Sequence, residues 1–263
     1  MATILREKKI KSADRVLEIL EMFDETRSSV TVMDVSRCLQ YPQSSTSELL
    51  GSLVKHGYLT RDRFLRTYRP TARVALLGAW VQPQLFRDGR LLPMMDELHD
   101  DSGEIVVLAS TVDVTLKHLH TVGETSPSLR AGSAHHILHS PLGRTLLSMT
   151  EREYVRKIVH RLNAESDEDR RVRYPDLAAN LDAIRSKGFA VGPVDADRSC
   201  VCVLLPQTGD QEKLALGLIV RTAELDARLD ELVRLVRGAV ASHLGPTMTR
   251  SQVTAAPAYA LAS

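Results

Sequence analysis

A polar run that follows a proline is the feature that most constrains this chain. Pro42 precedes six polar residues, Gln43, Ser44, Ser45, Thr46, Ser47 and Glu48. The apolar residues of the segment come only afterwards, at Leu49, Leu50, Leu53 and Val54. Proline cannot continue a helix but is tolerated at the start of one, so one helix ends before Pro42 and another begins at Gln43. This second helix has a polar front and an apolar rear. Such a helix can pack on a small core and place its N-terminal end in the major groove of DNA.

The segments on either side predict the rest of a small domain. Apolar residues recur with helical spacing after Ser12, and Thr31 can cap a second short helix. Gly57 can supply the left-handed residue that ends the third helix. Short β-prone pieces at 58–60 and 67–69 flank an Arg-rich turn and predict a hairpin. Three helices and a hairpin make a winged helix-turn-helix over residues 1–71, with a core of Val16, Ile19, Leu20, Val35, Leu39, Leu49, Leu53 and Leu59.

The remaining residues predict a second, larger domain. Residues 72–89 predict a linker helix, and residues 90–245 alternate between helices and strands. We expect helices at 91–99, 141–149, 151–161, 177–187 and 223–244. We expect strands at 105–109, within 111–119, at 200–205 and at 214–220. The Ala-, Thr- and Pro-rich residues 246–263 predict a disordered tail.

Composition narrows the class of protein. Hydrophobic residues at 43% and charged residues at 25% are typical of a soluble globular protein. The chain has no run of about 18 apolar residues and its start lacks a secretory signal, so we expect a cytoplasmic protein without a membrane span. The three cysteines, which cannot all pair, agree with a reducing compartment. Residues 1–80 hold 13 Lys and Arg against 9 Asp and Glu, and the other residues hold 21 against 24. A basic N-terminal part favours a nucleic-acid-binding module.

The candidate DNA contacts fall on the third helix and the hairpin. Gln can bond adenine edges, and Ser and Thr can reach bases or phosphates, which favours Gln43, Ser44, Ser45, Thr46 and Ser47. Clustered cations neutralise phosphates, and four lie in the hairpin at Arg61, Arg63, Arg66 and Arg69. Arg37 can add a backbone contact. The alternatives are a helix cap for the serines and surface ion pairs for the arginines.

The chain resembles the IclR family of bacterial transcription regulators. The first motif is Asp14-Arg15-Val16-Leu17-Glu18-Ile19-Leu20, and the second is Pro42-Gln43-Ser44-Ser45-Thr46. Leu50 with Leu53 and then Gly57-Tyr58-Leu59 follow at the family's spacing. Weaker motifs continue through Leu138-His139 with Gly143-Arg144 to about residue 245. The resemblance implies an α+β fold, with a winged helix-turn-helix, a linker helix and a GAF-like mixed α/β effector-binding domain. It also implies homodimers or tetramers on double-stranded operator DNA.

The resemblance also implies a pocket for a small organic effector. Its lining would comprise Gly132, Ser133, Ala134, Leu142, Cys200, Leu218 and Val220. In relatives that bind small carboxylates the last strand offers serines, whereas residues 216–220 are apolar here. We therefore expect an acid or aromatic metabolite that is more apolar than a two-carbon acid.

The second domain is rich in possible metal ligands, at His118, His120, His135, His136 and His139. His135 and His139 could share a helical face. We place Cys200 and Cys202 on opposite sides of their strand, where they cannot chelate one ion. We therefore predict buried thiols and loop histidines, with no metal and no cofactor.

These observations favour a transcription regulator over two alternatives. The leading interpretation is an effector-controlled regulator of a catabolic pathway, with repression the commoner behaviour in the family. One alternative is an α/β enzyme with an N-terminal helical module and Cys200 as candidate nucleophile. The other is a DNA-binding protein whose second domain only dimerises. We predict that the protein is not an enzyme, because nothing around Cys200 marks an acid or an oxyanion hole.

Overall fold

A computed structural model describes residues 11–23, 27–78, 89–124, 126–206 and 212–244. The chain forms two compact units, residues 1–82 and 83–263, and each is described by itself. Of the helices in the described residues, none is long and apolar enough to cross a membrane.

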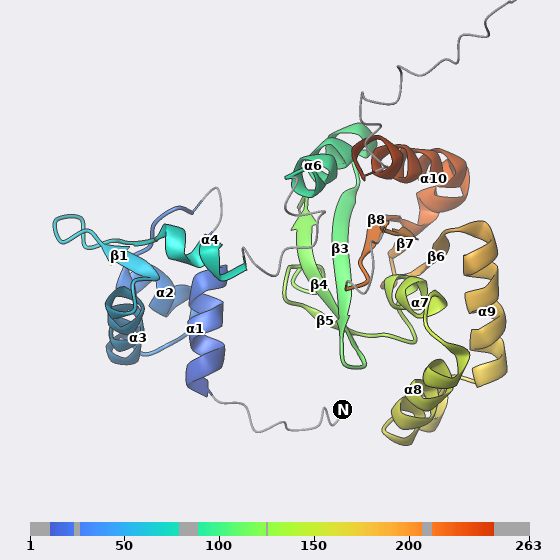
Figure 1. The fold of residues 1–263 in the computed structure, drawn as a ribbon, viewed down its shortest axis with the longest axis horizontal. Helices are drawn as coiled ribbons and strands as arrows, with labels where there is room; N and C mark the ends of the chain where they lie inside the picture. Colours follow the sequence, from blue (N-terminus) through green and yellow to red (C-terminus); the bar gives the residue numbers. More distant parts are fainter. Residues whose placement is uncertain (1–10, 24–26, 79–88, 125, 207–211, 245–263) are drawn as a thin grey trace, which may run out of the picture. The chain divides into compact units, whose positions relative to one another are not determined.

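The first unit is a winged helix-turn-helix (Figure 1). Its elements are α1 (Lys11–Glu21), α2 (Val32–Leu39), α3 (Gln43–Lys55), β1 (Leu59–Arg61), β2 (Tyr68–Pro70) and α4 (Ala72–Gly78). The antiparallel strands β1 and β2 form the predicted hairpin, and Val30 forms an additional bridge to Tyr68. The helices and the hairpin enclose one core of Ile19, Met22, Val30, Val35, Leu50, Leu53, Leu59 and Tyr68.

Local signals place the helix ends as the sequence predicts. The Thr31 side chain accepts from the backbone N–H of Asp34, whose carboxylate accepts from the Thr31 N–H at 2.8 Å. This reciprocal capping box fixes the start of α2. The backbone N–H and the hydroxyl of Thr31 both donate to the Asp34 carboxylate, and these two hydrogen bonds hold the pKa of Asp34 below its usual value. Gln40 is left-handed at the end of α2, with φ of 56°. Gly57, with φ of 78°, follows α3 as expected.

The second unit is built on one antiparallel six-stranded sheet in the order β5-β4-β3-β8-β7-β6. The strands are β3 (Ile105–Val112), β4 (Thr115–Val122), β5 (Ala134–His136), β6 (Ala190–Pro193), β7 (Arg198–Leu204) and β8 (Ala215–Arg221). The helices are α6 (Leu91–Ser102), α7 (Pro141–Ser148), α8 (Arg152–Ala164), α9 (Tyr174–Lys187) and α10 (Thr222–Leu244), with a 3₁₀ turn η1 at Glu168–Arg170.

The sheet of the second unit separates two hydrophobic cores. Helices α6 and α10 pack together on one face with Leu216, Leu218 and Val220 of β8. Helices α7, α8 and α9 contribute to the core on the other face, which includes Cys200, Cys202 and Ile219. Because successive side chains of a strand point to opposite faces, each central strand feeds both cores.

The structure differs from the sequence prediction in three places. The second strand begins at Thr115 and extends to Val122, and the short edge strands β5 and β6 were not predicted as strands. Leu50, rather than Leu49, is fully buried in the first core. The predicted linker helix corresponds to α4 as far as Gly78. Residues 79–88 of that prediction, and the tail at 246–263, lie outside the described residues.

Gly143 in the first turns of α7 lies against the Ile137 carbonyl, and a Cβ on Gly143 would overlap that oxygen. This close approach explains why the Leu-His…Gly motif needs a residue without a side chain at this position.

Gly143→Ala should lower the free energy of unfolding by about 1–3 kcal/mol, because the backbone must move to admit the methyl group. The matched control is Gly238→Ala, since Gly238 lies inside α10 with nothing within 4 Å of its added Cβ. This control should raise stability by about 0.5–1 kcal/mol. Urea unfolding of the two variants measures both changes, and equal effects would contradict the steric argument.

Candidate nucleic-acid interface and ligand cavity

The N-terminal end of α3 presents a polar surface. Gln43, Ser44, Ser47 and Glu48 are exposed, and Ser45 is half-buried with its hydroxyl donating to the Pro42 carbonyl at 3.0 Å. Thr46 is different, because it is fully buried and its hydroxyl also donates to the Pro42 carbonyl at 3.0 Å. The prediction that Thr46 contacts DNA is therefore wrong. Its short side chain closes the first turn of the helix, which agrees with the capping alternative at this one position.

The exposed face of α3 extends further than the sequence argument proposed. Ser47, Gly51 and Lys55 are exposed and four residues apart, so they lie along one side of the helix. Lys55 adds a cation at the far end of this side, which helical periodicity could have found. Arg37 is exposed in the last turn of α2.

The hairpin presents all four predicted arginines, Arg61, Arg63, Arg66 and Arg69, in exposed positions. Its turn is held by Asp62, whose carboxylate accepts from the backbone N–H groups of Phe64 and Leu65 at 2.8 and 2.9 Å. Arg66 takes a left-handed conformation with φ of 55°. These bonds hold the Asp62 carboxylate within the turn. The four arginines outnumber this carboxylate, so the hairpin surface is rich in positive charge.

The tip of the hairpin is apolar, which the sequence argument missed. Phe64 is 94% exposed and Leu65 is 58% exposed. Large exposed apolar side chains at a loop tip are typical of an interaction surface. Because Phe64 and Leu65 lie in the turn between Arg63 and Arg66, we include them in the same candidate interface.

The second unit contains a cavity of about 110 Å³ whose lining includes four histidines. His118 of β4 stacks on His135 of β5, with ring centroids 4.3 Å apart. His136 and His139 form a second ring pair at 4.6 Å. Ser140, Leu142, Pro193, Val194 and Ile219 complete the lining. Among the described residues that line the cavity, none is Asp or Glu.

Burial keeps these histidines neutral near pH 7. Burial, helped by the His135 ring, lowers the pKa of His118 to about 4. Burial, helped by His139 and Arg170, lowers the pKa of His136 to about 4. Burial also lowers the pKa values of His135 and His139. The cavity is therefore a polar, uncharged set of imidazoles close to cationic groups.

The structure corrects part of the predicted effector pocket. Leu218 and Val220 belong to the core under α6 and α10, on the opposite face of the sheet from the cavity. Their assignment to the lining was wrong, and Ile219 between them lines the cavity instead. A shift of one residue along a strand exchanges the two faces, and a continuous apolar run does not show which face each residue takes.

The other predicted pocket residues lie at or near the cavity. Leu142 is part of the lining, and Cys200 packs behind it against Gly217. Ser133 hydrogen-bonds both His118 and His135, at 3.1 and 3.2 Å. Gly132 bonds the His118 carbonyl through its backbone N–H at 2.7 Å, and Ala134 begins β5. These residues position the histidines, and the lining combines imidazoles with apolar side chains in place of the mainly apolar wall that the sequence predicted.

The two strand cysteines lie on the same side of β7, in the core with α7. The expectation of opposite sides was wrong, because residues two apart in a strand share a face. The hydrogen-bonding interaction of the Cys200 thiol with Cys202, together with burial, raises the pKa of Cys200 well above its usual value. A nucleophilic cysteine needs a lowered pKa and access to substrate, so Cys200 lacks the properties of the alternative enzyme. His135 lies in a strand, so the proposed helical pairing of His135 with His139 was also wrong.

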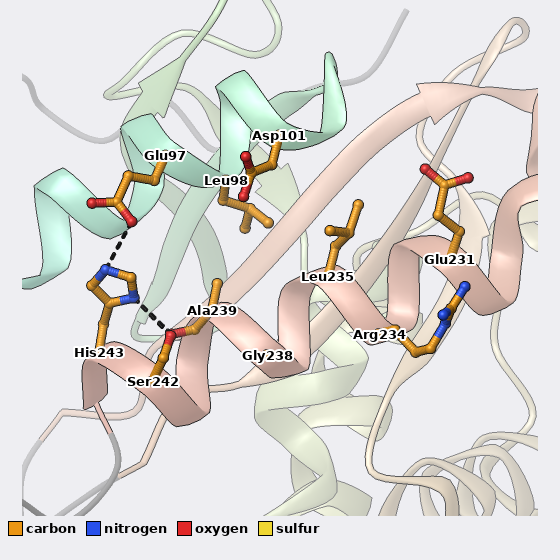
Figure 2. A pocket seen from close by; sticks show the side chains of 10 residues that line it. All are labelled: Glu97, Leu98, Asp101, Glu231, Arg234, Leu235, Gly238, Ala239, Ser242 and His243. Carbon is orange, nitrogen blue, oxygen red and sulfur yellow. Dashed lines mark hydrogen bonds and ion pairs between the residues drawn. The ribbon is translucent and has the colours of Figure 1, made fainter.

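A larger groove of about 510 Å³ lies between α6 and α10 (Figure 2). Leu98, Leu235 and Ala239 lie along it, and His243 bonds the Glu97 carboxylate at 3.0 Å across it. It lies on the face of the sheet opposite the histidine cavity. The smaller cavity is the stronger candidate for a ligand site, because His136 Nδ1 is buried there without a hydrogen-bond partner among the described residues.

The fold and the surfaces define a two-domain winged-helix regulator. Residues 12–63 match the sequence profile of the IclR helix-turn-helix domain, and residues 89–242 match that of the bacterial transcriptional regulator IclR C-terminal domain. The chain therefore belongs to the IclR family of bacterial transcriptional regulators, as its motifs suggested.

Relatives of the chain share modest identity over long stretches. The Pca regulon regulatory protein of Pseudomonas putida is 22% identical over 206 residues, which are 74% of this chain and 68% of that protein. The HTH-type transcriptional regulator XynR of Escherichia coli K12 is 19% identical over 84% of this chain and 89% of its own.

Solved structures of the family show the same fold. The Thermotoga maritima IclR structure superposes with a TM-score of 0.58 at 17% identity, covering 90% of this chain and all of that one. An IclR homologue of Microbacterium hydrocarbonoxydans, complexed with 4-hydroxybenzoate, gives a TM-score of 0.57 at 20% identity and covers 87% of this chain and 95% of its own.

Burial predicts that the native protein reacts with thiol reagents at one position. Cys38 is exposed, whereas Cys200 and Cys202 are buried. A chromogenic disulfide reagent should therefore modify one thiol in the folded protein and three after denaturation. Cys38→Ser should abolish the fast reaction, whereas Cys200→Ala should leave it unchanged. Fast modification of Cys200 in the Cys38→Ser variant would contradict the buried position.

Proposed function

We propose that the protein is a cytoplasmic repressor of catabolic genes that binds an operator as a homodimer, or as a tetramer formed by two such dimers, and responds to a small organic acid. Two copies of α3 would enter successive major grooves of a palindromic site, and the hairpins would lie along the flanking backbone. The observation that carries this proposal is the exposed polar face of α3 beside a hairpin with four exposed arginines.

The proposed roles follow from the chemistry of each side chain. Gln43, Ser44 and Ser47 are exposed at the N-terminal end of α3, where side chains of a recognition helix meet base edges. Ser45 is half-buried and bonded to the Pro42 carbonyl, so its main role would be to cap the helix and its contact with DNA would be secondary. Arg37, Arg61, Arg63, Arg66 and Arg69 would neutralise phosphates, which adds affinity without sequence preference.

The histidine cavity supports the choice of effector class. Its four histidines beside apolar side chains and its volume of about 110 Å³ favour a small acid over a large apolar molecule. The 4-hydroxybenzoate bound by the Microbacterium homologue and the Pca regulon of the Pseudomonas relative support an aromatic or related organic acid. An effector with unequal affinity for the DNA-competent and incompetent states would shift the population between them.

A regulator whose second domain only dimerises remains the competing function. Thermal unfolding distinguishes the two functions. An effector that binds the folded protein raises its melting temperature, whereas a domain that only dimerises shows no such rise with small organic acids. A footprint on the DNA upstream of the gene, with and without small organic acids, tests the operator and the effector together.

Two substitutions should separate base recognition from phosphate contact. Arg63→Ala should weaken binding to operator and to unrelated DNA alike, and lower the slope of log affinity against log salt by about 1. Gln43→Ala should reduce discrimination between the operator and a base-substituted operator by about 1–3 kcal/mol, with the salt slope unchanged. Fluorescence anisotropy over a range of salt concentrations measures both quantities.

The matched control is Arg173→Ala, because Arg173 is an exposed arginine of the second unit whose side chain pairs with Asp176 on its own helix. It should change neither the affinity nor the salt slope. Equal, uniform losses from Gln43→Ala and Arg63→Ala would show that their proposed roles are wrong.

A further inference from the structure

The histidine cavity has an unusual electrostatic make-up. Four imidazoles face one small space, and among the described residues of its lining there is no carboxylate to pair with them. His136 Nδ1 is buried without a hydrogen-bond partner in the described part of the chain. A buried polar atom that lacks a partner costs free energy, and a ligand that supplies the partner recovers it.

The elements around the cavity add positive charge. The backbone carbonyl of Arg170 in η1 accepts a hydrogen bond from His139 Nε2 at 3.0 Å. The guanidinium charge of Arg170 contributes, after burial, to lowering the pKa values of His136 and His139. Arg144 of α7 lies close enough to act on His139 as well, with its Nε donating to the Leu138 carbonyl at 2.8 Å.

The remaining described residues of the lining carry no carboxylate. The nearest acidic group on these walls is Asp195, which follows Val194 and accepts from the backbone N–H groups of Asp197 and Arg198. Arg198 of β7 is two residues before Cys200 on the same face, with Nη1 buried and unpartnered among the described residues. The Cys200 thiol is neutral because Cys202 and burial raise its pKa. Pro193 and Val194, at and after the end of β6, and Ile219 of β8 line the cavity without titratable groups. The charged groups that act on His136 and His139 are Arg170 and Arg144, and no carboxylate of the lining offsets them, so the site suits an anion.

We propose that the histidine cavity binds the carboxylate of the effector and takes up a proton from solvent as it does so. The inference rests on the proposed function, because it gives the chemistry of the effector site proposed there. Without ligand, the imidazoles are kept neutral by burial and by their crowding against one another. A carboxylate in the cavity reverses this balance, since a nearby opposite charge favours the protonated ring.

The direction of the pH dependence follows from linkage. The carboxylates of simple organic acids are fully ionised between about pH 6 and pH 8, so the ligand contributes no proton change there. Suppose that one histidine is neutral in the ligand-free protein and protonated in the complex. Over the pH range in which this holds, the affinity should rise about tenfold for each unit by which the pH is lowered. Binding without proton uptake would be independent of pH in this range.

Isothermal titration calorimetry of the full-length protein tests the proposal directly. The probes are pyruvate, benzoate and 4-hydroxybenzoate, each titrated at one pH in Tris and in a buffer of low ionisation enthalpy. The difference in heat between the buffers gives the number of protons taken up, which should be close to one. The neutral analogue 4-hydroxybenzamide should bind at least tenfold more weakly than 4-hydroxybenzoate and without proton uptake.

Variants identify the group that takes up the proton. Single His→Gln variants of the four cavity histidines should each reduce affinity, and at least one of them should abolish the buffer-dependent heat; they are His118→Gln, His135→Gln, His136→Gln and His139→Gln. His160→Gln is the matched control, because His160 is exposed on α8 and outside the lining. Thermal unfolding of each variant shows that it is folded, and the set of four keeps the test decisive if one of them does not fold.

Several outcomes would overturn the proposal. They are no binding by any of the three acids, equal heats in the two buffers, equal affinity for the amide, or unchanged proton uptake in all four cavity-histidine variants. Operator binding by the ligand-free protein is measured separately. Its loss would overturn the proposed function, whereas binding of an acid without proton uptake would overturn the present inference alone.

Discussion

Both faces of the six-stranded sheet are covered by helices, and this two-sided burial is the constraint on which the second unit depends. Each central strand must supply apolar side chains to two cores, so β8 sends Leu218 toward α10 and Ile219 toward the cavity. The groove between α6 and α10 lies on one face of the sheet (Figure 2). The histidine cavity lies on the other face, where β4, β5, the end of β6, β8 and the start of α7 contribute to its lining.

Sequence reasoning predicted the first unit well because its signals are local. The Thr31 cap, Pro42 and Gly57 each act within a few residues, and the structure places each of them at its expected helix end. The choice between Leu49 and Leu50 failed for a different reason. Neighbouring residues of a helix differ by about 100° around its axis, so two adjacent leucines at the edge of an apolar stripe are both compatible with the pattern. The position of the core decides between them, and it is a tertiary property.

The second unit depends on information that a single sequence does not carry locally. Residues 214–220 are apolar throughout, as expected for a strand buried on both faces, and such a run has no alternation from which to assign Leu218 or Ile219 to a face. The strand β5 holds His135 and His136 and pairs only with β4. Its local sequence predicts a loop. The cluster of histidines arises because this edge strand brings His135 beside His118, a contact between residues 17 positions apart.

Ser133 shows how the cavity can accommodate a change in protonation. Its hydroxyl lies 3.1 Å from His118 Nδ1 and 3.2 Å from His135 Nε2, yet a hydroxyl has one hydrogen to donate. While both bonds are made and both rings are neutral, the hydroxyl donates to one nitrogen and accepts from the other, which must carry a hydrogen. The tautomers of the two rings are therefore linked. If the nitrogen that accepts from Ser133 gains a proton, the hydroxyl can rotate its hydrogen away and accept from both nitrogens. One serine thus satisfies the pair in the neutral state and in the charged state, so the cavity can gain a proton without leaving either hydrogen bond unmade.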